Sequence, residues 1–149
     1  MTTKLAASLS LFLSLLVGHH PASADHTGDG RSDILWRNQD SGAHWLYQMN
    51  GASVEQMTPL FTVDTNWLPI TGDFNGDGLN DMVWRHQISG QNWLYQMNGK
   101  AITSSHAINI AAEPWRLVGS GDFNGDGVDD LLWRNASTGV VWQYQMHNG

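Results

Sequence analysis

Hydrophobic positions in this chain fall in short runs separated by polar, glycine-rich stretches. One kind of run joins two aliphatic residues to Trp-Arg and suits a short strand that is buried on both faces. A second kind alternates, with Trp, Tyr and Met on one face and Leu or Gln on the other, as in a strand whose two faces differ. The first kind occupies residues 34–37, 82–85 and 131–134, and the second occupies residues 44–49, 92–97 and 141–146.

The segments between these runs predict further strands. Asn-Gly pairs at 50–51 and 98–99 are strong signals for a tight turn after the alternating strand. Weaker strands are expected near residues 56–63 and 103–110, and strands that lead into the next loop at 67–72 and 115–119. No segment beyond residue 24 has the periodicity of a helix. The chain is therefore predicted to be all-β.

An acidic, glycine-rich segment precedes each Trp-Arg run. Its copies begin at Asp25, Asp73 and Asp122, which are 48 and 49 residues apart, a spacing typical of repeat proteins. Oxygen-bearing side chains stand at positions 1, 3, 5 and 9 of each copy, and glycines at positions 4 and 6. Four short strands in each period favour β-propeller blades of four antiparallel strands. A solenoid of β-hairpins is the alternative.

The spacing of these oxygens suits a hard cation. Calcium takes six to eight oxygen ligands, and glycine permits the tight curl through which alternate side chains converge. Polar turns rich in Asp, Asn and Gly are the alternative, but the same carboxylate placement in three copies disfavours it. The loops differ from an EF-hand because position 12 holds Trp instead of a bidentate Glu.

The predicted calcium ligands are the oxygens at positions 1, 3, 5 and 9, with the backbone carbonyl of position 7. In the second and third loops these are Asp73, Asn75, Asp77, Leu79 and Asp81, and Asp122, Asn124, Asp126, Val128 and Asp130. In the first loop they are Asp25, Thr27, Asp29, Arg31 and Asp33. Thr27 replaces the Asn of the other copies, and Asp25 would stand beside a new N-terminus after export. We therefore expect the first loop to bind calcium most weakly.

Residues 1–24 have the order of a secretory signal peptide. Lys4 precedes an apolar run over residues 5–17, and Ala22-Ser23-Ala24 forms a small-residue cleavage site. The run is too short to cross a bilayer, and a buried N-terminal helix is the alternative. We expect a secreted protein, extracellular or periplasmic, without another membrane segment.

Composition narrows the classes of function. The formal net charge is −7, and nine of the fourteen acidic residues stand at positions 1, 5 and 9 of the three loops. The sequence therefore offers no basic surface for nucleic acid. Cysteine is absent, which excludes disulfides, thiolate metal sites and a thiol nucleophile.

No unique catalytic constellation is visible, so the chain is predicted not to be an enzyme. His44, His86, His106 and His147 occupy non-equivalent repeat positions and are expected at the surface. The Trp residues at 36, 84 and 133 are expected to pack between blades, and the Arg residues at 37, 85 and 134 to pair with loop carboxylates or carbonyls. The weaker candidates for ligand binding, through stacking on sugar rings, are Trp45, Trp93, Trp142, Tyr47, Tyr95 and Tyr144.

The Asp-Phe-Asn-Gly-Asp-Gly loop, the apolar pair with Trp-Arg and the Trp-x-Tyr-Gln-Met-Asn-Gly strand together resemble the FG-GAP or VCBS-type repeat of secreted bacterial proteins. This group is related to the calcium-bearing blades of integrin α subunits. The resemblance covers residues 25–149, as repeats 25–72, 73–121 and 122–149. It implies a β-propeller with calcium held between the first two strands of a blade. It implies little about activity, because such repeats occur in adhesins, in lectin-like proteins and beside secreted enzymes.

The predicted strands number three, four and three, or about two and a half blades. A closed propeller has about four to eight blades, so closure requires a homo-oligomeric ring or a longer parent protein. We expect a recognition or adhesion module for carbohydrate or protein, with structural calcium. The alternatives are an accessory or truncated module of a secreted hydrolase and a purely structural assembly unit.

Overall fold

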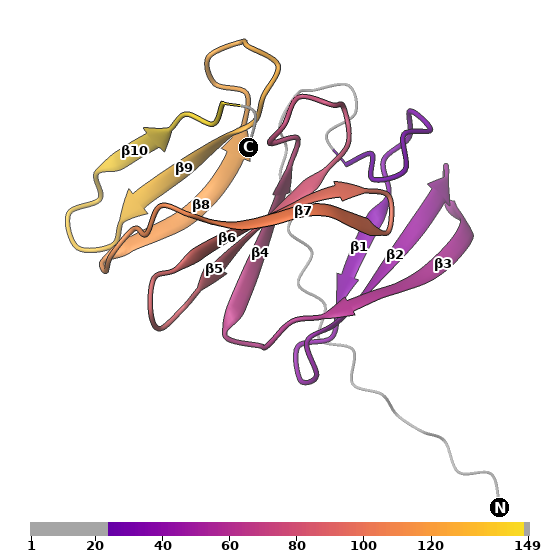
Figure 1. The fold of residues 1–149 in the computed structure, drawn as a ribbon, viewed down its shortest axis with the longest axis horizontal. Helices are drawn as coiled ribbons and strands as arrows, with labels where there is room; N and C mark the ends of the chain where they lie inside the picture. The colour runs from indigo at the N-terminus through magenta and orange to yellow at the C-terminus, as the bar shows by residue number, and fades with distance from the viewer. Residues whose placement is uncertain (1–23, 148–149) are drawn as a thin grey trace, which may run out of the picture.

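The computed structural model describes residues 24–147 and consists of strands and connecting loops in this range. Ten strands form three antiparallel sheets, so the predicted all-β class is confirmed (Figure 1). The predicted signal peptide falls, apart from Ala24, outside the described residues. Within the described residues no helix is long and apolar enough to span a membrane.

Each sheet is a meander in which consecutive strands are neighbours. The first sheet contains β1 (Ile34–Arg37), β2 (Ala43–Asn50) and β3 (Ser53–Thr62). The second contains β4 (Trp67–Gly72), β5 (Asp81–His86), β6 (Asn92–Asn98) and β7 (Ala101–Ile108). The third contains β8 (Trp115–Gly121), β9 (Asp130–Asn135) and β10 (Val141–Tyr144). The sheets follow one another as blades of an open propeller that does not close (Figure 1).

The hairpin after the alternating strand is as tight as its Asn-Gly pair predicts. Asn50 pairs with Ser53 and Asn98 with Ala101, so each turn has two central residues, and Gly51 has φ +58°. A turn of this length lets the residue directly after it pair with the last residue of the preceding strand. The strand β3 therefore begins at Ser53, three residues before the start expected from its weak hydrophobic pattern.

The cores lie between neighbouring sheets. Between the second and third sheets, buried apolar side chains from both sheets and both loops make one cluster: Phe74, Val83, Leu94, Val128, Leu131, Trp133 and Met146. A second cluster joins the first and second sheets and contains Met82, Trp84 and Met97, with Leu60 and Phe61 packed against it. The predicted packing role of Trp84 and Trp133 is confirmed, because they are 1% and 4% exposed.

The sequence predicted His44 at the surface, but the structure buries it. Its side chain is 1% exposed and meets the ring of Trp84 edge-on, with 5.1 Å between ring centroids. Its Nδ1 lies 3.3 Å from the carbonyl oxygen of Phe61. The expectation was wrong because the neighbouring blade covers this strand position, and nothing in the local sequence reveals that cover.

Candidate functional site

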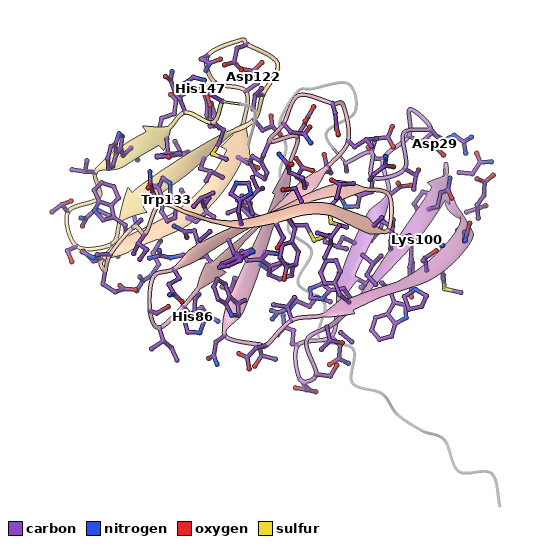
Figure 2. All side chains as sticks on the ribbon, in the orientation of Figure 1. Asp29, His86, Lys100, Asp122, Trp133 and His147 are labelled. Atoms are coloured by element: carbon purple, nitrogen blue, oxygen red, sulfur yellow. The ribbon has the colours of Figure 1, made fainter. Side chains whose placement is uncertain are left out.

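The three acidic loops lead into β1, β5 and β9 and lie along one edge of the array of sheets (Figure 1). Asp29 of the first loop and Asp122 of the third lie toward opposite ends of that edge (Figure 2). In the second loop, Gly76 and Gly78 have φ of +77° and +84°. Only glycine adopts this region at little cost, so the two glycines make the curl.

The first aspartate of each loop closes the curl. Asp73 accepts hydrogen bonds at Oδ1 from the backbone N–H groups of Gly76 and Asp77, at 2.6 and 3.1 Å, and at Oδ2 from Gly78, at 2.8 Å. Asp122 accepts the equivalent three bonds in the third loop, at 2.6, 3.2 and 3.0 Å. Both loops therefore wrap around their first carboxylate.

The side chains at positions 3 and 5 meet each other. Asn75 Nδ2 donates to Asp77 Oδ2 at 3.1 Å, while Asp77 Oδ1 accepts the N–H of Leu79 at 2.8 Å. Asn124 and Asp126 repeat this arrangement, with Nδ2 of Asn124 at 3.0 Å from Oδ2 of Asp126. The predicted ligand side chains of one loop are thus held within that loop.

The aspartate at position 9 is buried and ties the loop to a neighbouring strand. Asp81 is fully buried, and it accepts the N–H of Met97 at 2.7 Å and that of Phe74 at 3.2 Å. Asp33 and Asp130 accept the N–H of Met49 and Met146 in the same way, at 3.1 and 3.0 Å. Sequence reasoning missed this link, although a constant separation of 16 residues between the Asp and the Met was available as a signal.

The carboxylates of the second loop lie close enough to affect one another's ionisation. Burial raises the pKa of Asp81 to about 7; the N–H bonds from Met97 and Phe74 oppose this rise, and the nearby carboxylates of Asp77 and Asp73 add to it. These carboxylates are thus close enough to repel one another, and a bound cation would relieve that repulsion.

The donor set fits calcium in its chemistry, since it consists of carboxylate, amide and carbonyl oxygens. Within residues 24–147, no group of three or more His, Asp or Glu side chains is arranged as a metal site. The carboxylates instead accept backbone N–H groups. A carboxylate oxygen has two lone pairs, so Oδ2 of Asp73, which accepts one N–H, retains an acceptor position, whereas its Oδ1 already accepts two.

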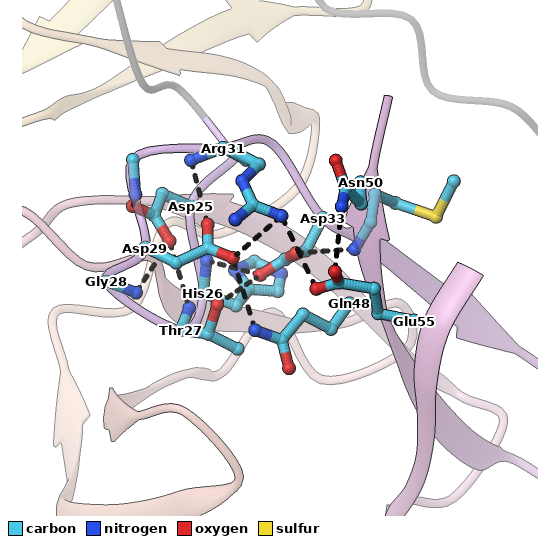
Figure 3. Close-up of polar contacts among 12 residues, drawn as sticks. Asp25, His26, Thr27, Gly28, Asp29, Arg31, Asp33, Gln48, Asn50 and Glu55 are labelled. Carbon is cyan, nitrogen blue, oxygen red and sulfur yellow. Dashed lines mark hydrogen bonds and ion pairs between the residues drawn. The ribbon is translucent and has the colours of Figure 1, made fainter. Parts of the chain in front are cut away.

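The first loop keeps the curl but has additional side-chain partners for its carboxylates (Figure 3). Asp25 accepts the N–H groups of Gly28 and Gly30, at 2.6 and 2.7 Å. The hydroxyl of Thr27 donates to Asp33 at 3.1 Å. The Gln48 amide donates to Asp29 at 3.2 Å and lowers the pKa of that carboxyl, which also has the guanidinium of Arg31 at 3.8 Å.

The loops of adjacent blades are also bonded to each other. The N–H of Asn80 donates to the carbonyl oxygen of Asp25 at 3.0 Å, and the N–H of Asp129 donates to that of Asp73 at 2.7 Å. Both donors occupy position 8, which sequence reasoning left without a role. The backbone makes this bond at both interfaces, and at the second the Asp129 side chain adds another, because its Oδ2 accepts the N–H of Asp73 at 3.0 Å.

The aromatic candidates fall into two groups. Tyr47 and Tyr95 are half-buried and pack on Trp36 and Trp84, at 5.7 and 5.9 Å between ring centroids, while Tyr144 accepts a hydrogen bond from Asn109. The exposed members are Trp45, Trp93 and Trp142, at 38, 39 and 62%. The tryptophans remain available to solvent and the tyrosines largely do not.

Two of the recurring arginines pair with carbonyl oxygens, as expected. Arg37 donates to the carbonyl of Asp64 at 3.1 Å. Arg85 donates to the carbonyls of Gly90 and Trp115, and its guanidinium lies 5.2 Å from the centre of the Trp133 ring. Arg85 therefore joins the second and third blades.

Comparison with known proteins identifies a repeat family. A family model described as FG-GAP-like repeat matches residues 25–84 and again residues 73–133. Searches of curated proteins and of solved structures gave no match.

Proposed function

Because this chain belongs to the FG-GAP-like repeat family, we propose that it is a calcium-stabilised, non-catalytic recognition module that works outside the cell. The observation that carries the calcium part is the identical curl of the second and third loops, in which the position-1 carboxylate accepts three N–H groups of its own loop. A generic polar turn has no need of two further carboxylates beside the first.

The residues that would hold calcium are those at positions 1, 3, 5, 7 and 9. In the second loop they are Asp73, Asn75, Asp77, the Leu79 carbonyl and Asp81, and in the third Asp122, Asn124, Asp126, the Val128 carbonyl and Asp130. A bound divalent cation supplies positive charge among these oxygens. The buried Asp81 and Asp130 would carry its effect to Met97 and Met146, at the ends of the alternating strands.

The recognition part rests on the exposed tryptophans. Trp45, Trp93 and Trp142 occupy one repeat position on three successive sheets and keep 38 to 62% of their surface in solvent. Exposed aromatic rings with a polar N–H are favoured at binding surfaces. Carbohydrate or protein partners both suit exposed rings of this kind.

Thermal unfolding of the full chain in calcium and in chelator tests the calcium role. Extracellular calcium modules bind at about 10⁻⁴–10⁻³ M, and a site at a hundred times its dissociation constant gains about 2.7 kcal/mol. We expect calcium to raise the melting temperature. An equal melting temperature in calcium and in chelator would remove calcium from the proposal.

A double variant assigns the effect to the loops. Asp77→Asn with Asp126→Asn keeps side-chain shape and an acceptor for the N–H of position 7, but removes one charge from each loop. It should lose most of the calcium-induced rise. Asp40→Asn, at an exposed position outside the loops, is the control for loss of a surface carboxylate and should retain it.

Recognition is tested separately on arrays of glycans and extracellular proteins, with the wild-type chain and a Trp45→Ala, Trp93→Ala, Trp142→Ala variant. We expect binding that the triple variant loses. Absence of wild-type binding on both arrays would overturn the recognition role without affecting the calcium result.

A further inference from the structure

A cavity of about 320 Å³ opens between the second and third blades. One wall is the chain that leaves β7, and the other is the face of β9 and β10 with the start of β8. Its lining is largely aliphatic and aromatic, with polar groups from Asn109, Glu113 and Tyr144. A mostly apolar cavity of a few hundred Å³ with few polar groups is the usual form of a small-molecule site.

The repeat shows which residues correspond at the two interfaces between blades. A 48-residue offset places Asn109 at the position of Phe61 and Ala111 at that of Val63. A hydrogen bond confirms this correspondence. The His44 ring nitrogen meets the carbonyl of Phe61, and the Asn92 amide donates to the carbonyl of Asn109.

At the first interface the ring of Phe61 fills the space between the blades. It meets Tyr95 edge-on at 5.4 Å and 85°, and Trp84 at 6.1 Å and 69°. The corresponding rings at the second interface are Tyr144 and Trp133, 49 residues further along, and both line the cavity.

At the second interface no aromatic side chain is available at this position. The Asn109 amide instead donates to the hydroxyl of Tyr144 at 2.7 Å. Ala111 is also smaller than Val63. Trp133 and Tyr144, which line the cavity, thus correspond to Trp84 and Tyr95, which surround the Phe61 ring at the first interface.

We propose that this cavity binds a small molecule with one aromatic ring and a hydrogen-bonding substituent. The ring makes with Trp133 and Tyr144 the edge-to-face contacts that Phe61 makes with Trp84 and Tyr95, a geometry that aromatic pairs prefer. Trp115 and Trp142, whose centroids are 5.9 Å apart at 61°, add two further aromatic walls. The substituent reaches the Asn109–Tyr144 pair.

The lining disfavours a sugar in this cavity. Asn109 is already bonded to Tyr144, and Glu113 forms an ion pair with Arg116. A pyranose has hydroxyl groups around its whole ring, and those left without partners in an apolar cavity cost binding energy. An aromatic ring with one polar group has far fewer hydrogen-bonding groups that need partners.

This inference goes beyond the recognition role proposed above, because it concerns a small-molecule ligand and rests on the cavity and not on calcium. Failure of the calcium test or of the arrays would leave its own test intact, because that test measures a different ligand directly.

The probe is 4-fluorophenol, observed by ¹⁹F NMR with the full chain. We expect saturable binding to the wild-type chain. Cyclohexanol, of similar size but not aromatic, should compete at least fivefold more weakly than phenol, and methyl β-D-glucopyranoside should not compete. Absence of saturable binding, equal competition by cyclohexanol, or stronger competition by the glucoside would overturn the proposal.

The matched variant gives the second interface the residue types that the first has at positions 61 and 63. Asn109→Phe with Ala111→Val should fill the cavity and weaken 4-fluorophenol binding at least tenfold, without a lower melting temperature. Trp142→Ala removes one wall at a side chain that is 62% exposed, and should weaken binding several-fold in a chain that remains folded. Unchanged affinity in Trp142→Ala, or in a folded double variant, would contradict the proposal.

Discussion

The backbone N–H of Asp73 donates a hydrogen bond to Oδ2 of Asp129 at 3.0 Å, and the N–H of Asp129 donates to the carbonyl oxygen of Asp73 at 2.7 Å. The second and third loops are therefore joined by two reciprocal bonds at the first position of one and the eighth of the other. Val128 packs beside this link, since its Cγ2 lies 3.3 Å from where a Cβ on Gly76 would be. The predicted ligand loops are thus part of the interface between blades.

The position of Val128 beside Gly76 predicts that substitution of two equivalent glycines lowers the free energy of unfolding by different amounts. Gly76 and Gly125 both occupy position 4, with φ of +77° and +81°. A Cβ on Gly76 would meet Val128, whereas a Cβ on Gly125 would meet nothing within 4 Å. Gly125→Ala should cost about 1–2 kcal/mol for the left-handed backbone alone, and Gly76→Ala should cost more. Urea unfolding of both variants checks the order, and equal costs would exclude a contribution from the stacking contact.

The first loop should gain calcium affinity when its two unusual residues are replaced. Thr27→Asn with Arg31→Leu gives it the residues of the second loop at positions 3 and 7 and removes the guanidinium beside Asp29. We expect calorimetric titration with calcium to reveal one more tight site than in the wild-type chain.

The control for this variant removes the same charge elsewhere. Arg134→Leu changes an exposed arginine in β9, outside the first loop, and should leave the number of tight sites unchanged. A wild-type chain whose first loop already binds most tightly, measured by loop-specific substitution, would refute the expected order of affinities.

The sequence predicts much of this fold because the information is local. Asn-Gly pairs, glycines with positive φ and the Trp-Arg runs each act within a few residues, and the repeat multiplies every signal. Contacts between blades are harder to predict, because they join residues that are far apart in the sequence. The local sequence therefore does not reveal that Trp84 covers His44, or that Asn109 bonds to Tyr144 where the first interface has the ring of Phe61.

Burial of His44 predicts a loss of stability in mild acid. The pKa of His44 is lowered from 6.5 to about 4, mainly by burial and also by the nearby Arg37, against hydrogen bonds to the Phe61 and Gly42 backbone that raise it. The unfolded chain therefore binds more protons than the folded one between about pH 6.5 and 4. The stability that neutral, buried His44 contributes is fully present above pH 6.5 and is lost as the pH falls through this range.

His44→Asn isolates this effect, since Asn92 occupies the same repeat position and its amide donates to the equivalent carbonyl, that of Asn109. Denaturant unfolding at pH 7 and pH 5 should show the wild-type chain losing stability relative to His44→Asn at the lower pH. A constant difference between wild type and His44→Asn would show that His44 does not titrate in this way.

Two tryptophans on different sheets should differ sharply in their contribution to stability. Trp84 on β5 is 1% exposed and touches His44, Phe61 and Tyr95, whereas Trp142 on β10 is 62% exposed. Truncation of a buried Trp leaves a cavity, so Trp84→Ala should cost about 3–5 kcal/mol. Trp142→Ala should cost less than about 1 kcal/mol, because a mostly exposed ring leaves little unfilled space. Urea unfolding measures both, and comparable losses would mean that Trp142 is covered in solution and is not available for binding.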